Sequence, residues 1–203
     1  PSSPLRLWVF ALVLSLSAGF HFGYNLVISN PSQGAFVKFL NNSFAPMSNE
    51  ALSSYWSLIV SLLYFGGIFG SFYIRIAADR LGRKNAIYLT TVGQTFACLL
   101  SILAFFVRSA HMYAFSRFLI GFFQSMAVGI APMFLSESSP PHIRGRISLS
   151  TGLSVQLSVV IGSIMAMPQV IGDSWYLLYV IELLVLIIPL LLIPIFPDSP
   201  SFL

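Results

Sequence analysis

Long apolar runs alternate with short polar links along most of the chain. Six runs are long enough to cross a bilayer as helices, because about 20 helical residues span its hydrocarbon core. They cover approximately residues 7–29, 54–76, 87–107, 113–136, 147–170 and 176–196. Pro and Gly interrupt several runs, but helices in a bundle tolerate them where neighbouring helices satisfy the freed backbone groups. The pattern predicts an all-α membrane protein whose six transmembrane helices form one bundle over residues 1–203.

The composition agrees with a membrane protein. Hydrophobic residues make up 57% of the chain and charged residues 8%, whereas soluble domains carry about 25% charged residues. The net charge is +4, but the basic residues lie in short links and form no continuous patch, so we expect no nucleic-acid partner. Cys98 lies inside an apolar run, and a buried, unreactive thiol is expected there.

The motifs that accompany catalysis are missing from the sequence. We find no phosphate-binding loop, nucleophile elbow or cluster of metal ligands, and the predicted topology separates His21, His111 and His142. These absences predict a protein that is not an enzyme and needs neither a cofactor nor a metal.

The basic residues indicate an orientation in the membrane. With the N terminus inside, seven of the ten Lys and Arg residues lie on or beside the cytoplasmic face, two lie outside, and Arg117 falls within a span. The seven are Arg6, Arg75, Arg80, Arg83, Lys84, Arg144 and Arg146. An excess of Lys and Arg in short loops marks the cytoplasmic side. We therefore expect a multi-pass protein with both ends in the cytoplasm, and we expect it in the plasma membrane.

This orientation makes residues 30–53 the longest external loop. Asn41-Asn42-Ser43 within it matches the acceptor sequence for N-glycosylation. Asn41 is therefore the expected glycosylation site, and the alternative is an ordinary polar loop tip.

Several motifs occur in the order found in a known family. They are Phe22-Gly23-Tyr24-Asn25, Asn30-Pro31, Asp79 to Lys84, Ser116 to Gly121, Pro132-Met133-Phe134, Glu137, Arg144-Gly145 and Pro197-Asp198-Ser199-Pro200. Together they resemble the sugar porters of the major facilitator superfamily, especially the animal facilitative glucose transporters (GLUT). The resemblance implies the N-terminal six-helix half of a two-half transporter, with the C-terminal half absent. Substrate would lie near the midplane between this bundle and the missing half or a second copy of the chain.

The resemblance assigns a mechanical role to the charged links. In the family, such residues hold the cytoplasmic helix ends together in the outward-open state. The expected latch consists of Asp79, Arg80, Arg83, Glu137 and Arg144, whose carboxylates and guanidinium groups can form charge-assisted hydrogen bonds. The alternative is that these charges only fix the topology. Arg75 departs from the family, which usually has Gly there, and its bulk is expected to loosen the latch.

The resemblance also implies a wall of the substrate cavity. It consists of Phe22 on the first helix and Val155, Gln156 and Val159 on the fifth. Gly152 shares their helical face by its spacing, but the family generally has a Gln there whose amide bonds sugar hydroxyls. Gln156 is expected to supply an amide one turn away; alternatively it bonds a neighbouring helix.

Two ionisable residues fall inside predicted spans. A charge at the centre of a membrane helix costs roughly 2.5–3.5 kcal/mol on insertion scales, so Arg117 and Glu182 are expected to form an ion pair between the fourth and sixth helices. Proton-coupled relatives place an Asp where this chain has Asn25, whose amide does not release a proton. We expect facilitative hexose uniport by alternating access. The alternative is a non-transporting membrane sensor or partner-binding half-transporter.

Overall fold

The computed structural model describes the backbone of residues 4–43 and 48–195, and these residues form helices and connecting turns without strands. The predicted all-α membrane fold is confirmed, because six helical segments within these ranges are long and apolar enough to cross a membrane. The motif at residues 197–200 lies outside the described residues.

The first span contains a change of helix type. It comprises α1 (Pro4–Ser15), a π-helical turn η1 (Leu16–Phe20) and α2 (His21–Val27). The remaining elements are α3 (Gln33–Ser43), α4 (Asn49–Leu81), α5 (Arg83–Val107), α6 (Ala110–Ser138), α7 (Arg144–Met165), α8 (Pro168–Ile171), α9 (Tyr176–Leu192) and a 3-10 turn η2 (Ile193–Ile195). The helix α4 extends past both ends of the predicted apolar run. The helix α7 ends before residue 170, because Pro168 has no N–H to continue it and instead begins α8.

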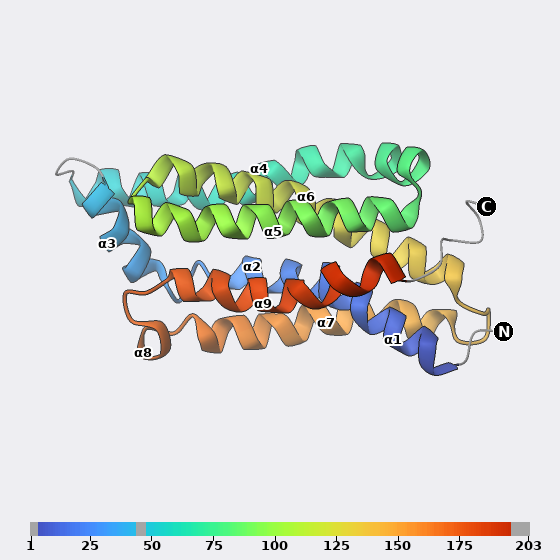
Figure 1. Ribbon diagram of the computed structural model, residues 1–203. Coiled ribbons are helices and arrows are strands. Elements are labelled where there is room, and N and C mark those ends of the chain that lie inside the picture. Colours follow the sequence, from blue (N-terminus) through green and yellow to red (C-terminus); the bar gives the residue numbers. More distant parts are fainter. Residues whose placement is uncertain (1–3, 44–47, 196–203) are drawn as a thin grey trace.

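The helices lie roughly along one axis in a bundle (Figure 1). The α4–α5 and α6–α7 links lie at the same end as the start of α1 and the end of α9, which we name the link end, whereas α3 and α8 lie at the opposite end, the α3 end. The helix α6 packs extensively on α4 and α5, while α2 packs on α7 and α5 packs on α9. The first span is the most buried of the six, and α4 and α7 are the least buried. The first span therefore forms the interior of the bundle.

Glycines let α4 and α6 approach until their backbones touch. A Cβ atom at Gly66 of α4 would collide with the carbonyl oxygen of Phe118, and one at Gly121 of α6 would collide with that of Leu63. Small residues commonly allow such close packing between membrane helices. The interface between α4 and α6 consequently has little room for a larger side chain at either position.

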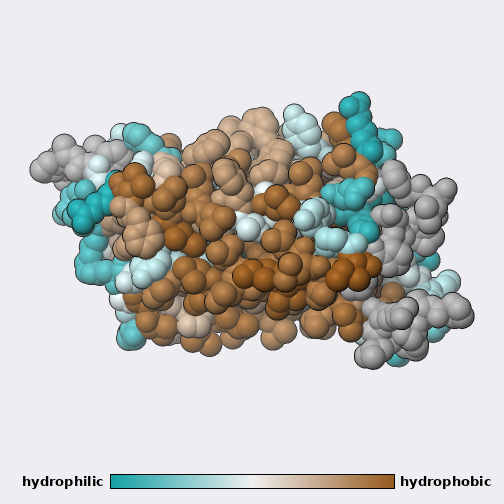
Figure 2. All heavy atoms as spheres, viewed as in Figure 1, coloured by the Kyte–Doolittle hydropathy of each residue, from teal (hydrophilic) through white to brown (hydrophobic). Residues whose placement is uncertain are grey.

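The surface is apolar through its middle and polar toward its ends. Figure 2 shows hydrophobic residues over most of the visible face, with hydrophilic residues gathered toward the two ends. Many large apolar side chains of α4 and α7 are exposed, including Phe72 and Leu149. A surface of this kind is suited to contact with lipid or with another apolar bundle.

An aromatic cluster packs together at the α3 end of the bundle. The ring of Phe36 on α3 lies 4.8 Å from that of Trp56, 5.1 Å from that of Tyr113 and 4.6 Å from that of Trp175. Aromatic pairs at such separations contribute about 0.5–1.5 kcal/mol beyond burial of their area. They fix α3 against α4, α6 and the residue that precedes α9.

Candidate functional site

One face of the first span carries a stripe of buried polar side chains. Its members are Ser17, His21, Asn25, Ser29 and Ser32. Spacings of four residues place Ser17, His21 and Asn25 along one side of the helix, and Ser29 and Ser32 follow in the turns after α2. Ser17 shares a hydrogen bond of 2.8 Å with Thr91 of α5, and Ser29 accepts one of 2.7 Å from Arg117 of α6. The stripe therefore faces the interior of the bundle.

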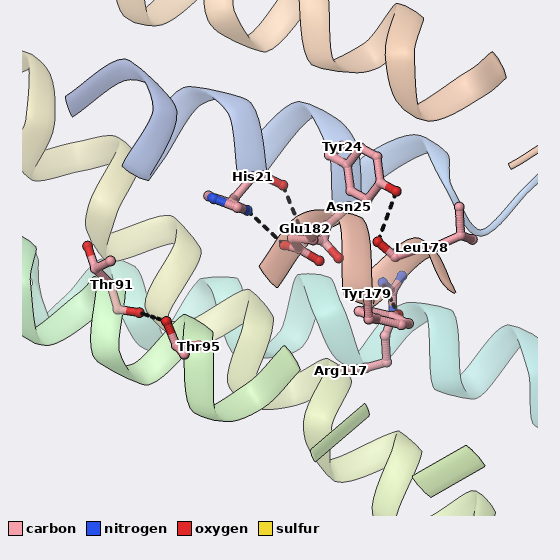
Figure 3. Close-up of polar contacts among 9 residues, drawn as sticks. All are labelled: His21, Tyr24, Asn25, Thr91, Thr95, Arg117, Leu178, Tyr179 and Glu182. Atoms are coloured by element: carbon pink, nitrogen blue, oxygen red, sulfur yellow. Dashed lines mark hydrogen bonds and ion pairs between the residues drawn. The ribbon is translucent and has the colours of Figure 1, made fainter. Parts of the chain in front are cut away.

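Glu182 of α9 lies beside the middle of this stripe. Its Oε1 accepts hydrogen bonds from Nδ1 of His21, at 3.0 Å, and from Nδ2 of Asn25. The side chains of His21 and Glu182 are 0% and 1% exposed, and the thiol of Cys98 on α5 lies close to the same carboxylate. Figure 3 shows the imidazole and the amide directed toward Glu182 from successive turns of α2. These contacts connect the first span to the last.

Arg117 is held by hydroxyl groups. Its Nη2 donates to Ser29, and its Nη1 lies 3.5 Å from the hydroxyl oxygen of Tyr179. That hydroxyl also lies 2.9 Å from the hydroxyl of Tyr113. The guanidinium is buried, so α6, α9 and the turn after α2 meet around it.

The predicted direct ion pair between Arg117 and Glu182 is wrong. Within the described residues, the salt-bridge partner of Glu182 within 4.0 Å is His21, while Arg117 contacts Ser29 and Tyr179. Tyr179 precedes Glu182 by almost one helical turn on α9, so Arg117 meets α9 one turn away from the carboxylate. Both charges nevertheless belong to one buried cluster.

Sequence reasoning missed His21. The prediction considered the three histidines only as a group, and His111 and His142 are indeed exposed while His21 is fully buried. Among the described residues, no group of three potential metal ligands is present. The sequence feature that could have indicated the burial of His21 is a polar residue at every fourth position, from Ser17 to Ser29, in an otherwise apolar segment.

The predicted substrate wall lies on the other side of the first span. A Cβ atom at Gly23 would collide with the carbonyl oxygen of Val155, so α2 and α7 are in backbone contact at this level. Phe22 is half-buried and Gln156 is exposed, whereas Val155 and Val159 are half-buried. Gly152 is exposed, and a Cβ atom there would meet nothing within 4 Å. The role of these residues in binding substrate stays a prediction.

At the link end, the structure brings three of the five predicted latch residues together. Nε of Arg83 lies 3.2 Å from each carboxylate oxygen of Glu137, and Nη1 lies 3.8 Å from Asp79. Gly82, with φ of +79°, turns the chain between α4 and α5 and so positions Arg83. The side chains of Arg83 and Glu137 are only 17% and 24% exposed. This contact joins the end of α6 to the α4–α5 link.

The other two predicted latch residues, Arg80 and Arg144, are not in ion pairs with the described part of the chain. Among the described residues, neither Arg80 nor Arg144 has a carboxylate within 4.0 Å. Arg75 is 93% exposed and lies 3.5 Å from Asp79, one helical turn away. Whether the group acts as a latch remains a prediction.

The predicted glycosylation residue lies at the α3 end. Asn41 is exposed in the last turn of α3. Lys38 of the same helix forms an exposed ion pair of 2.8 Å with Asp173. Carbohydrate attachment at Asn41 stays a prediction, and its side chain is accessible for it.

Comparisons with known proteins agree with this architecture. The profile of the family described as "Sugar (and other) transporter" matches residues 10–203. The solute carrier family 2, facilitated glucose transporter member 3 of Ovis aries is 30% identical over 96% of this chain and 41% of its own length. Member 9 of Homo sapiens is 28% identical over 97% of this chain and 38% of its own length.

Solved transporters share the fold. The inward-open xylose transporter XylE from E. coli superposes with a TM-score of 0.75 at 20% identity, covering 96% of this chain and 49% of that one. A D-xylose-proton symporter gives a TM-score of 0.74 at 20% identity, over 95% of this chain and 48% of that one. The chain thus spans about half the length of the solved structures and less of its curated relatives. It belongs to the sugar (and other) transporter family, in which it corresponds to the N-terminal six-helix half of a major facilitator superfamily sugar porter.

Proposed function

We propose that this bundle forms one half of a facilitative hexose transporter. The observation that carries the proposal is the family match over residues 10–203, together with relatives whose names describe glucose transport. In such repeat architectures the solute binds near the midplane between two bundles, which rock about it. The solute would move by alternating access, with a second bundle supplying the opposite wall.

The wall that this chain contributes combines an aromatic ring and an amide. Phe22 on α2 offers an apolar surface to the C–H face of a sugar ring, and the exposed Gln156 on α7 offers a donor and an acceptor to hydroxyl groups. Ligand pockets commonly combine mostly apolar walls with a few placed polar groups. Gly152, with open space around it, enlarges the cavity one turn away.

Uniport is favoured over proton symport by the residue at position 25. The side chain of Asn25 is a buried amide that donates to Glu182 and to the backbone oxygen of His21. An amide has no proton to release at physiological pH. Transport should therefore equilibrate a sugar gradient and not build one.

The Arg83 contact with Asp79 and Glu137 would hold the link end of the bundle in one shape while the two halves rock. It is partly shielded from water, and charge-assisted bonds of this kind are stronger than neutral ones. We place this end in the cytoplasm and the α3 end outside the cell, in the plasma membrane, because the basic residues concentrate in the links.

The orientation is tested by glycosylation. Expression of the protein in animal cells should give a band that glycosidase treatment shifts to lower mass, and Asn41→Gln should abolish the shift. Asn42→Gln is the matched control, because Asn42 is not followed by the acceptor pattern. A shift that persists in Asn41→Gln would place the carbohydrate elsewhere.

The transport mode is tested with purified native protein in liposomes. Labelled hexose should enter until the inner and outer concentrations are equal, with or without an inward proton gradient. Accumulation above equality that disappears with a protonophore would instead establish symport. Entry no faster than into protein-free liposomes would favour the non-transporting alternative.

A further inference from the structure

The buried cluster around Glu182 contains more polar atoms than it has partners for. Four buried atoms of this cluster have no hydrogen-bond partner within the described part of the chain: Nε2 of His21, Oδ1 of Asn25, Nε of Arg117 and Oε2 of Glu182. Native structures leave few buried polar atoms unsatisfied, and each costs about 1–3 kcal/mol. A concentration of four in one cluster indicates that the site takes a further ligand.

The burial of the cluster limits the size of that ligand. His21 and Asn25 are 0% exposed, and Arg117 and Glu182 are 1% exposed, within this bundle alone. A sugar in a cavity beside α7 could not touch them, because they line the opposite side of the first span. Only water or a proton is small enough to be taken up at such a site.

The hydrogen-bond geometry identifies the proton-accepting atom. Nδ1 of His21 lies 3.0 Å from the Glu182 carboxylate, so Nδ1 carries the hydrogen and donates it. In a neutral imidazole the other nitrogen then has a free lone pair, and Nε2 has no partner. We propose that Nε2 of His21 is an exchangeable proton-binding atom, with the Glu182 carboxylate as the counter-charge of the imidazolium that forms.

The surrounding groups make such a charge acceptable. The Glu182 carboxylate acts electrostatically on Tyr24 of α2, Cys98 of α5, Tyr113 and Arg117 of α6, and Tyr179 of α9. Of these, only Arg117 carries a charge at neutral pH. One carboxylate balances one guanidinium while His21 is neutral, and proton uptake leaves the cluster with one net positive charge. Pairing with Glu182 would offset part of the cost of burying this charge.

Protonation would act on the connection between the first and last spans. A charged imidazole donates a stronger hydrogen bond to a carboxylate than a neutral one does, so α2 would be held more firmly to α9. The opposite side of α2 is in backbone contact with α7, which carries Gln156. The rate of sugar transport should therefore change with pH through His21. This effect on transport rests on the proposed function, whereas proton binding at His21 does not.

Proton binding is tested directly by NMR of protein labelled with 15N-histidine in nanodiscs. The His21 signals are identified by their loss in His21→Gln, with His111→Gln as the matched exposed control. If His21→Gln fails to fold, the His111→Gln and His142→Gln variants identify the other two histidines of this chain by elimination.

We expect the His21 signals to show a neutral ring protonated at Nδ1 at high pH and a doubly protonated ring at low pH. Signals that stay unchanged over the whole pH range in which the protein is folded would overturn the proposal. They would show that the hydrogen bond between His21 and Glu182 is only structural.

The effect on transport is tested separately by uptake into liposomes at matched inner and outer pH. The change of rate with pH should be lost in His21→Gln and retained in His111→Gln. An unchanged pH profile in His21→Gln would overturn the connection to transport. Titration of His21 in a protein that takes up no sugar would overturn the proposed function and leave the proton site standing.

Discussion

The imidazole of His21 and the carboxylate of Glu182 lie 3.0 Å apart, although 161 residues separate them in the sequence. The contact joins the first transmembrane span to the last inside the bundle. Further hydrogen bonds join the same face of the first span to α5 through Thr91 and to α6 through Arg117. The first span is therefore the element around which the other helices of this half are organised.

Neutralising Glu182 should destabilise the bundle. Glu182→Gln leaves the Arg117 guanidinium buried without the one carboxylate of the cluster, which should cost on the order of 3 kcal/mol. Removing the guanidinium as well should restore part of the loss, although the two groups make no direct contact. The coupling free energy between the two side chains is obtained from thermal unfolding of Glu182→Gln, Arg117→Gln and the double variant. Strictly additive changes in stability would show that the two charges are independent.

Gly23 should not accept a larger side chain. In Gly23→Val the new atoms would meet the backbone carbonyl of Val155, and a backbone carbonyl in a helix cannot move aside easily. We expect a loss of about 1–3 kcal/mol or more, as in other overpacked interiors, seen as a lower melting temperature in detergent. Gly152→Ala is the matched control on the facing helix and should melt like the wild type, because its Cβ has open space. Equal melting of both variants would contradict the close contact of α2 with α7.

Arg83 and Arg80 should behave differently despite lying three residues apart. Arg83→Gln removes the contacts with Glu137 and Asp79 and should cost about 1 kcal/mol, since hydrogen bonds to charged groups contribute more than neutral ones but this one is partly exposed. Arg80→Gln should change the melting temperature little, because no carboxylate of the described residues lies within 4.0 Å. Equal losses in the two variants would show that the Arg83 contacts add nothing to stability.

The α7 face offers a gain-of-function test of the substrate wall. Gly152→Gln places an amide into open space on the face that Gln156 shares, so it should lower the KM for hexose uptake. Gln156→Ala should raise the KM. A hydrogen bond of this kind contributes about 0.5–1.5 kcal/mol, which corresponds to a few-fold change. If neither variant alters uptake kinetics while both proteins fold, this face does not contact the substrate.

The helices were predictable because their cause is local. About 20 consecutive apolar residues can satisfy their backbone in lipid only as a helix, so each apolar run specified a span without knowledge of its neighbours. The π-helical turn at Leu16–Phe20 was not predictable in this way. No Pro or charge marks it in the sequence, although Gly19 within it lies against the backbone of α7 at Thr151.

The partners of buried polar groups were harder to predict than their presence. Membrane burial alone implied that Arg117 and Glu182 need partners. Their depths in the membrane agreed to within a helical turn, but the choice of partner depends on rotation of each helix about its axis. Rotation places Tyr179 toward Arg117 and His21 toward Glu182. The polar spacing from Ser17 to Ser32 was the feature of the sequence that could have indicated the buried face of the first span.

The most direct test of the account is stereospecific uptake by the purified native protein in liposomes. D-glucose should enter along its gradient with saturable kinetics, whereas L-glucose should enter no faster than it does into liposomes without protein. Equal rates for the two enantiomers, or no uptake of D-glucose by a folded protein, would contradict the conclusion that this bundle forms half of a hexose transporter.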